Sequence, residues 1–281
     1  MHKTSLRASL AAVPAVLAVT ACLTAAGTAQ ASTLPTLSIA ITPSSATVGG
    51  AHESGAVNVV STDTGVKEAT VILFLLKPGA SVAEAEAFTK EKKGAHDPNN
   101  SSKLGSIVFD TEANPGQTGE AQTALQPGQY VVLVGAGEGE VQVRTSFTVT
   151  AAKSPATLPA PGATIRSIEF AFRGASTLHD GELVRFENEG FLVHMDIAFP
   201  VKNMKVAKHV VKLLLAGKEK GLEKLISGAP VTFQGPVSHE AFQQETITAK
   251  PGIYVQACFM DTQDGRSHTQ LGMERIIKIT K

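Results

Sequence analysis

The sequence predicts an all-β protein made of tandem Greek-key β-sandwiches, each with a short inserted helix. Three observations favour this fold class. Short runs of β-branched and apolar residues recur with turn residues between them. A Pro/Ala-rich stretch at residues 151–162 divides the chain as a stiff linker would. The segments after this stretch repeat the segments before it at a nearly constant offset, which indicates two similar domains.

The chain begins with a stretch that is typical of an export signal. Two basic residues precede an apolar run at residues 8–26, and a small-residue motif follows and ends at Ala31. We expect residues 1–31 to be a signal peptide cleaved after Ala31, so that the protein is secreted or lies at the cell surface. A second interpretation is a lipobox at residues 19–22, in which Cys22 carries a lipid anchor. No later apolar run approaches the roughly 18 residues of a membrane span.

The first predicted domain covers residues 37–150. Its helix is expected to begin at Val82 and to end near Gly94. Its strands are predicted at Leu37–Thr42, Val57–Ser61, Ala69–Leu76, Ser106–Phe109, Tyr130–Gly135 and Val141–Thr150. This regular spacing of short strands and turns is typical of a sandwich.

The second predicted domain covers residues 163–281 and repeats the first. The turn that begins at Pro127 recurs at Pro251, which is 251 − 127 = 124 positions later. The helix predicted to begin at Val82 has a counterpart that is predicted to begin at Val206 and to end near residue 226. The simplest explanation of a fixed offset is a duplicated domain.

The two copies differ where side chains that bind metals occur. The second copy has His194 where the first has Ala69, and it has Cys258 where the first has Val134. The loop after Cys258 is also longer than its counterpart by several residues. Such a difference is expected when a site is lost from one copy or gained by the other. Taken alone, Cys258 could equally be a buried, inert thiol, because no second cysteine follows the signal peptide.

The tail of the second copy has an ordered pattern of soft ligands. Gly252, Tyr254 and Cys258 form Gly-x-Tyr-x-x-x-Cys, and His268 follows with Met273 five positions later. This pattern resembles the C-terminal copper loop of the cupredoxins. The resemblance covers residues 163–281 and is most specific after Pro251. It implies that residues 163–281 are a cupredoxin-like domain, and that residues 37–150 are a degenerate cupredoxin or immunoglobulin-like sandwich without metal ligands.

The resemblance implies a single copper ion held by Cys258, His268 and Met273 together with His194. A thiolate and two imidazoles form a trigonal set, and a thioether is the weak axial ligand of a blue-copper site. The position of His194 departs from the pattern, because the alternating apolar residues around it, from Val193 to Phe199, place its side chain on the opposite face of the strand. Either a β-bulge turns His194 inward, or His194 is a surface residue and the site is incomplete.

The composition narrows the classes of function. Lys plus Arg and Asp plus Glu number 25 each, so the chain lacks the positive charge of a nucleic-acid binder. The sequence has no His-x-His pair, no Gly-x-Ser-x-Gly motif and no His-Glu-x-x-His motif, from which we predict that it is not an enzyme. The favoured function is type 1 copper binding for electron transfer or copper handling, with a redox protein or a copper donor or acceptor as partner. The alternative is a metal-free extracellular binding module.

Overall fold

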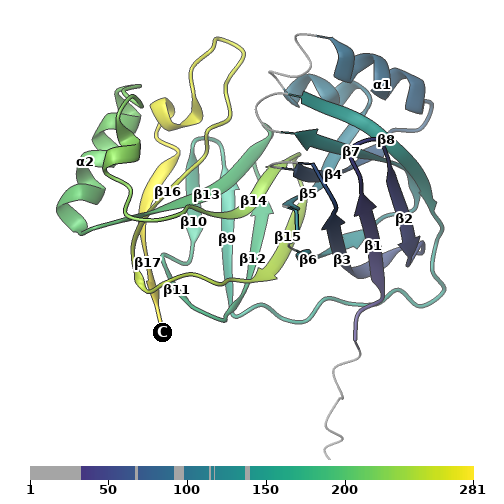
Figure 1. Cartoon of the computed structure of the whole chain (residues 1–281), viewed down its shortest axis with the longest axis horizontal. Helices are drawn as coiled ribbons and strands as arrows, with labels where there is room; N and C mark the ends of the chain where they lie inside the picture. Colours follow the sequence, from purple (N-terminus) through teal and green to yellow (C-terminus); the bar gives the residue numbers. More distant parts are fainter. Residues whose placement is uncertain (1–32, 67–68, 92–97, 114, 117, 137–139) are drawn as a thin grey trace, which may run out of the picture. The chain divides into compact units, whose positions relative to one another are not determined.

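The computed structural model describes residues 33–66, 69–91, 98–113, 115–116, 118–136 and 140–281. Residues Thr33–Lys281 form one compact unit. Strands dominate this unit (Figure 1), which confirms the predicted all-β class. The predicted signal peptide and Cys22 lie outside the described residues. No helix in the described ranges is long and apolar enough to cross a membrane.

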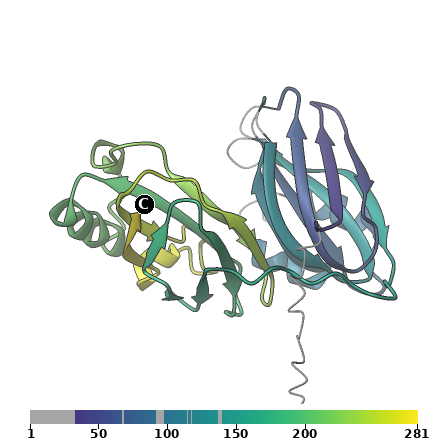
Figure 2. The same cartoon turned by 90° about the horizontal axis from the view of Figure 1, so that it is seen from below.

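The strands of the first half form two layers (Figures 1 and 2). One layer has the strand order β2-β1-β3-β6 and the other has the order β5-β4-β7-β8. The strands are β1 (Thr36–Ile41), β2 (Ala46–Gly50), β3 (Gly55–Asp63), β4 (Ala69–Leu76), β5 (Gly105–Glu112), β6 (Thr118–Leu125), β7 (Gly128–Ala136) and β8 (Glu140–Val149). Alternate side chains from both layers, among them Ile39, Leu73 and Val132, form the buried core between them.

The second half has the same plan with different strands. One layer has the order β10-β9-β12-β15, and the other has the order β14-β13-β16-β17-β11. The strands are β9 (Ala163–Ile168), β10 (Ala171–Gly174), β11 (Thr177–His179), β12 (Leu183–Asn188), β13 (His194–Val201), β14 (Val231–Val237), β15 (Phe242–Thr246), β16 (Gly252–Ala257) and β17 (Glu274–Thr280). The core between its layers includes Phe186 and Phe233, whose rings are stacked, and also Cys258 and Met273.

The pairing of strands is equivalent in the two halves. Strand β1 pairs antiparallel with β2 and parallel with β3, and β9 pairs antiparallel with β10 and parallel with β12. Strand β4 lies between β5 and β7 just as β13 lies between β14 and β16. Ala69 is the first residue of β4, and His194 is the first residue of β13. Gene duplication is still a prediction, but this shared topology is what it requires.

Each half carries its helix between equivalent strands. Helix α1 (Val82–Lys90) follows β4, and its first turn is closed by a capping box between Ser81 and Glu84. Helix α2 (Met204–Leu215) follows β13. Both helices are shorter than predicted. Helix α2 ends because Gly217 adopts a left-handed backbone conformation with φ of 63°, and only a short 3₁₀ helix, η2 (Leu222–Lys224), continues the predicted range. Two further 3₁₀ helices are η1 (Pro98–Lys103) and η3 (His268–Leu271).

The two halves share backbone and side-chain contacts. Residues Gln122 of β6 and Gln244 of β15 pair, which joins the two outer layers into one sheet of eight strands. Ser238 exchanges two hydrogen bonds with the backbone of Ile107, at 2.8 and 2.9 Å. One cluster of buried apolar residues contains Val131 of the first half and Val237 of the second. The two sandwiches therefore pack as parts of a single folded unit.

Candidate metal centre

Three segments of the second half bring potential metal ligands to one end of a sheet. His194 is the first residue of β13, Cys258 follows the last residue of β16, and His268 begins η3 in the loop between β16 and β17. Strand β16 pairs antiparallel with both β13 and β17, so the start of β13 lies beside the end of β16. The fold thus collects residues that are up to 74 positions apart in the sequence.

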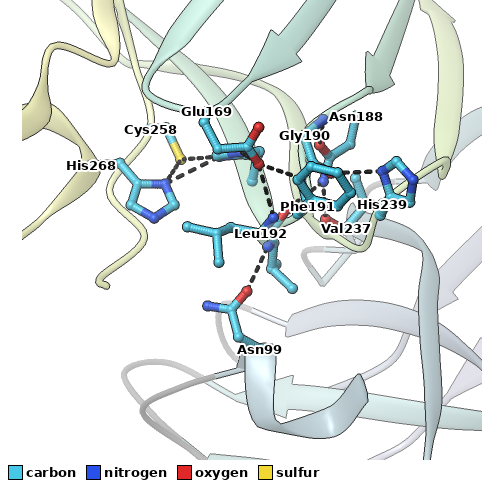
Figure 3. Close-up of polar contacts among 12 residues, drawn as sticks. Asn99, Glu169, Asn188, Gly190, Phe191, Leu192, Val237, His239, Cys258 and His268 are labelled. Atoms are coloured by element: carbon cyan, nitrogen blue, oxygen red, sulfur yellow. Dashed lines mark hydrogen bonds and ion pairs between the residues drawn. The ribbon is translucent and has the colours of Figure 1, made fainter. Parts of the chain in front are cut away.

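The potential ligand atoms of these three side chains all lie within 4.8 Å of one another. Figure 3 shows the side chains of Cys258 and His268 directed toward each other. The two Nδ1 atoms of His194 and His268 are 3.1 Å apart. The Sγ atom of Cys258 lies 3.4 Å from Nδ1 of His268 and 3.8 Å from Nδ1 of His194. All three side chains are fully buried.

The spacing of the ligand atoms suits one metal ion. Metal bonds of about 2.0 Å to nitrogen and about 2.3 Å to sulfur, set roughly 120° apart, separate neighbouring ligand atoms by about 3.5 to 3.7 Å. Two of the three distances between the ligand atoms, 3.1 and 3.4 Å, lie below this range, and the third, 3.8 Å, lies just above it. The donor set of two imidazoles and one thiolate is the trigonal set of a blue-copper site. The cluster is therefore suitable for one copper ion.

The second half has the two-layer β-sandwich fold that the resemblance to cupredoxins implied. Its two-layer fold carries a His, Cys and His cluster in the order and at the sheet positions that the resemblance implied. A search of the described residues for three or more His, Cys, Asp or Glu side chains with converging ligand atoms gives this group. The assignment of these residues as metal ligands is still a prediction.

The protonation states of His194, Cys258 and His268 follow from the burial of their side chains. Burial and, to a smaller extent, the neighbouring His268 together lower the pKa of His194 to about 3. Burial also lowers the pKa of His268 to about 4, against an opposite effect from Glu169. Burial raises the pKa of the Cys258 thiol to about 12. At neutral pH the metal-free site therefore holds two neutral imidazoles and a thiol.

The side chain of His194 points into the protein. The residues that alternate with it on β13, namely Asp196 and Ala198, are buried, whereas Met195 and Ile197 are partly exposed. The apolar alternation therefore indicated the wrong face, and the interpretation of His194 as a surface residue is wrong. The pairing of β13 with β14 is irregular on both sides of Asp196, as the predicted bulge requires. The outward apolar side chains of this strand contact the core and α2 instead.

Met273 is fully buried next to the cluster. Its backbone N–H donates to the carbonyl of His268 at 3.0 Å, and its carbonyl accepts from the N–H of Cys258 at 3.1 Å. Its side chain lies in the same core cluster as Cys258. The backbone of Met273 is thus held between two of the predicted ligands, and its role as the axial ligand stays a prediction.

Glu169 supports the segment that carries His194, and the sequence pattern gave no indication of it. Its Oε1 atom accepts from the backbone N–H groups of Phe191 and Leu192, the latter at 3.2 Å (Figure 3). The same oxygen lies 4.0 Å from Nε2 of His194. A Cβ atom at Gly190 would stand 2.7 Å from both Glu169 Oε1 and His194 Nε2, so a larger residue there would force one of these side chains to move. A carboxylate near the outer nitrogen of a ligating imidazole is a common way to orient that ring.

Comparisons with known proteins find only distant similarity to solved structures. No family model matches the sequence, and no curated protein matches it significantly. The chain is similar to the reduced auracyanin from Roseiflexus castenholzii, with 18% identity, 42% of this chain and 95% of that chain covered, and a TM-score of 0.26. It is similar to a copper-containing nitrite reductase from Thermus scotoductus, with 11% identity, coverage of 88% and 68%, and a TM-score of 0.25. A multicopper oxidase gives 11% identity, coverage of 87% and 88%, and a TM-score of 0.22.

These comparisons contradict the prediction that the chain is not an enzyme. The solved structures that it matches over most of its length include a nitrite reductase and a multicopper oxidase, which are enzymes. The absence of these three motifs was too narrow an observation to exclude enzymes as a class. The absence of His-x-His pairs and of two hydrolase motifs from the sequence argues against those particular sites, not against catalysis as a whole.

Proposed function

We propose that the protein is an exported type 1 copper protein that transfers electrons or handles copper. The ion would be held by His194, Cys258 and His268, with Met273 as a weak axial ligand. The observation that carries this proposal is the convergence of two Nδ1 atoms and one Sγ atom, 3.1 to 3.8 Å apart, in a fully buried cluster. Bound copper would supply one-electron redox chemistry.

The side chains of the cluster can provide the lone pairs that bind such an ion. The neutral imidazoles of His194 and His268 can each offer a lone pair from Nδ1, and the Cys258 thiol must release its proton to become a ligand. The backbone N–H of Met195 donates to Cys258 Sγ at 3.4 Å, which stabilises negative charge on the sulfur. The enclosed, largely apolar surroundings exclude water and keep the ligands in place.

A copper titration of the reduced, folded chain tests the proposal. We expect one equivalent of Cu(II) to produce strong visible absorption from a thiolate-to-copper transition. Cys258→Ser should abolish this absorption, and His194→Ala should weaken copper binding. The control is His239→Ala, because His239 lies nearby and contacts the carbonyl of Gly190 at 2.8 Å but is not in the cluster. A colourless titration would favour the metal-free binding module instead.

The axial position can be tested with two matched substitutions. Met273→Leu should retain copper and change the reduction potential, because an axial thioether tunes the ion more than it holds it. Met204→Leu removes a thioether from an exposed position at the start of α2 and should leave the potential unchanged. Equal potentials for both variants in protein-film voltammetry would remove Met273 from the proposed ligand set.

Export is the second part of the proposal and is supported by the N-terminal sequence pattern. Mass spectrometry of protein from the native host should find a mature chain that begins at Ser32. A lipid-modified Cys22 would indicate the anchored form. Recovery of the chain with Met1 intact would contradict export.

A further inference from the structure

A cavity of about 220 Å³ lies in the first half, on the face of the β5-β4-β7-β8 sheet that is covered by α1. Ile72, Phe74 and Leu133 line it from the sheet, and Ala85 and Phe88 line it from α1. The copper ligands predicted above are not part of its wall. A dry cavity of about 150 Å³ holds benzene, so this one has room for a molecule of one or two rings.

Asp110 contributes one carboxyl group to a mainly apolar lining. The hydroxyl groups of Thr89 and Ser101 also line the cavity, but they donate to the backbone carbonyls of Glu86 and Pro98. Asp110 of β5 is only 2% exposed. Its backbone N–H donates to Gln243 Oε1 at 3.3 Å, but within the described residues no hydrogen bond reaches its carboxyl oxygens. A Cβ atom at Gly235 would stand 2.4 Å from one of these oxygens, so glycine at this position leaves the carboxyl group its space.

The environment of Asp110 favours the neutral form of its carboxyl group. Burial raises its pKa well above the usual range, and the nearby charge of Glu112 raises it further. A protonated carboxyl group offers one O–H donor. A buried polar group without a partner costs free energy, which a ligand with an acceptor atom would recover.

We propose that this cavity binds a small, neutral, mainly apolar molecule that carries one hydrogen-bond acceptor, such as a ketone or ester oxygen, directed at Asp110. The apolar walls exclude a charged ligand, and the single donor selects for the acceptor. Met260 and Pro236 of the second half complete the wall, so the ligand would contact both halves of the chain. The site is independent of the proposed copper function.

Matched aromatic probes test this assignment on the full chain. Acetophenone carries the acceptor, α-methylstyrene replaces its oxygen by CH₂, and protonated 1-phenylethylamine carries a charge. By methyl-detected NMR titration we expect acetophenone to bind about three- to tenfold more tightly than α-methylstyrene, as one hydrogen bond allows. Tighter binding of the amine, or no binding of acetophenone, would overturn the proposal.

Variants locate the binding site. Asp110→Leu should remove the preference for the ketone, and Asp110→Asn should keep it because an amide N–H can donate. Leu133→Trp should fill the cavity and abolish binding of both neutral probes, and Ala85→Leu serves the same purpose if the tryptophan variant does not fold. The control is Glu86→Gln on the exposed side of α1, which should bind like the wild type. Unchanged binding by a folded cavity-filling variant would refute the site.

Discussion

Cys258 is the residue whose chemistry decides how metal enters the cluster. Its thiol is protonated at neutral pH, since burial raises its pKa to about 12, while the imidazoles of His194 and His268 are already neutral. Binding as a thiolate must therefore displace the thiol proton, whereas the imidazoles, with pKa values of about 3 and 4, have no proton to lose from the binding nitrogen at neutral pH.

We predict that binding of one copper ion releases about one proton and that the apparent affinity rises roughly tenfold per pH unit between pH 7 and 8. The sign follows because the bound form lacks a proton that the free form carries. Calorimetry in two buffers with different ionisation enthalpies counts the protons. Cys258→Ser should release fewer protons, and release of two or more by the wild type would contradict neutral imidazoles in the free protein.

The loop between β12 and β13 is the element that positions His194, and Asn188 holds it together. The Nδ2 group of Asn188 donates to the carbonyls of Leu192 and Val237, both at 2.8 Å, and its Oδ1 accepts from the N–H of Gly190 at 2.9 Å. Asn188 is only 1% exposed, so water cannot replace these bonds.

We predict that Asn188→Ala lowers the free energy of unfolding by about 3 kcal/mol, because it leaves buried backbone groups without partners. The matched control is Asn203→Ala, which removes an exposed N-cap bond to Val206 at 3.1 Å and should cost about 1 kcal/mol. Urea unfolding monitored by circular dichroism gives both values. Equal losses would mean that the loop is not held by Asn188.

At this scale the sequence predicted some elements well and missed others for identifiable reasons. Strand β4 was predicted with its observed bounds because eight consecutive apolar or β-branched residues form it. Strand β6 (Thr118–Leu125) was missed because its sequence, TGEAQTAL, has few β-branched or large apolar residues, and pairing with β3 decides its structure. Helix α2 was predicted too long because the lysine-rich pattern continues after Gly217.

The candidate site shows a similar division. The ordered tail indicated Cys258 and His268 through its resemblance to the cupredoxin copper loop, and the structure brings both together. The inward position of His194 could not be predicted from apolar alternation. The apolar side chains Met195, Ile197 and Phe199 are only partly buried, whereas the polar side chains of His194 and Asp196 are buried on the opposite face of β13. The contribution of Glu169 depends on tertiary contacts with residues more than 20 positions away, which no local pattern records.

For the whole molecule, the contacts between the halves indicate that the linker is not what keeps them together. Besides the two bonds between Ser238 and Ile107, Thr123 Oγ1 donates to the carbonyl of Phe242 at 2.8 Å, and the side chain of Gln244 donates to Gln122 Oε1 at 2.9 Å. Apolar residues from both halves are buried in one cluster.

We predict that the halves remain associated after the linker is cut. A protease site inserted next to Leu158 provides the cut, and gel filtration of the cleaved protein should show one peak that contains both fragments. The same sample in urea should separate into two peaks, which shows that cleavage was complete. Two peaks without denaturant would mean that the shared contacts are too weak to hold the halves.

A further contact links the half without predicted ligands to the segment that carries His194. The side chain of Asn99 in η1 accepts from the backbone N–H of Val193 at 2.7 Å, one residue before His194 (Figure 3). His194 and one of the residues that hold its segment in place, Asn99, therefore come from different halves of the chain. The effect of a substitution at Asn99 should therefore be measured as a change in the visible absorption of the copper-titrated chain. Under the predicted duplication, substitutions in the first half would be constrained by the cluster in the second half, which would be a reason to retain a copy without ligands.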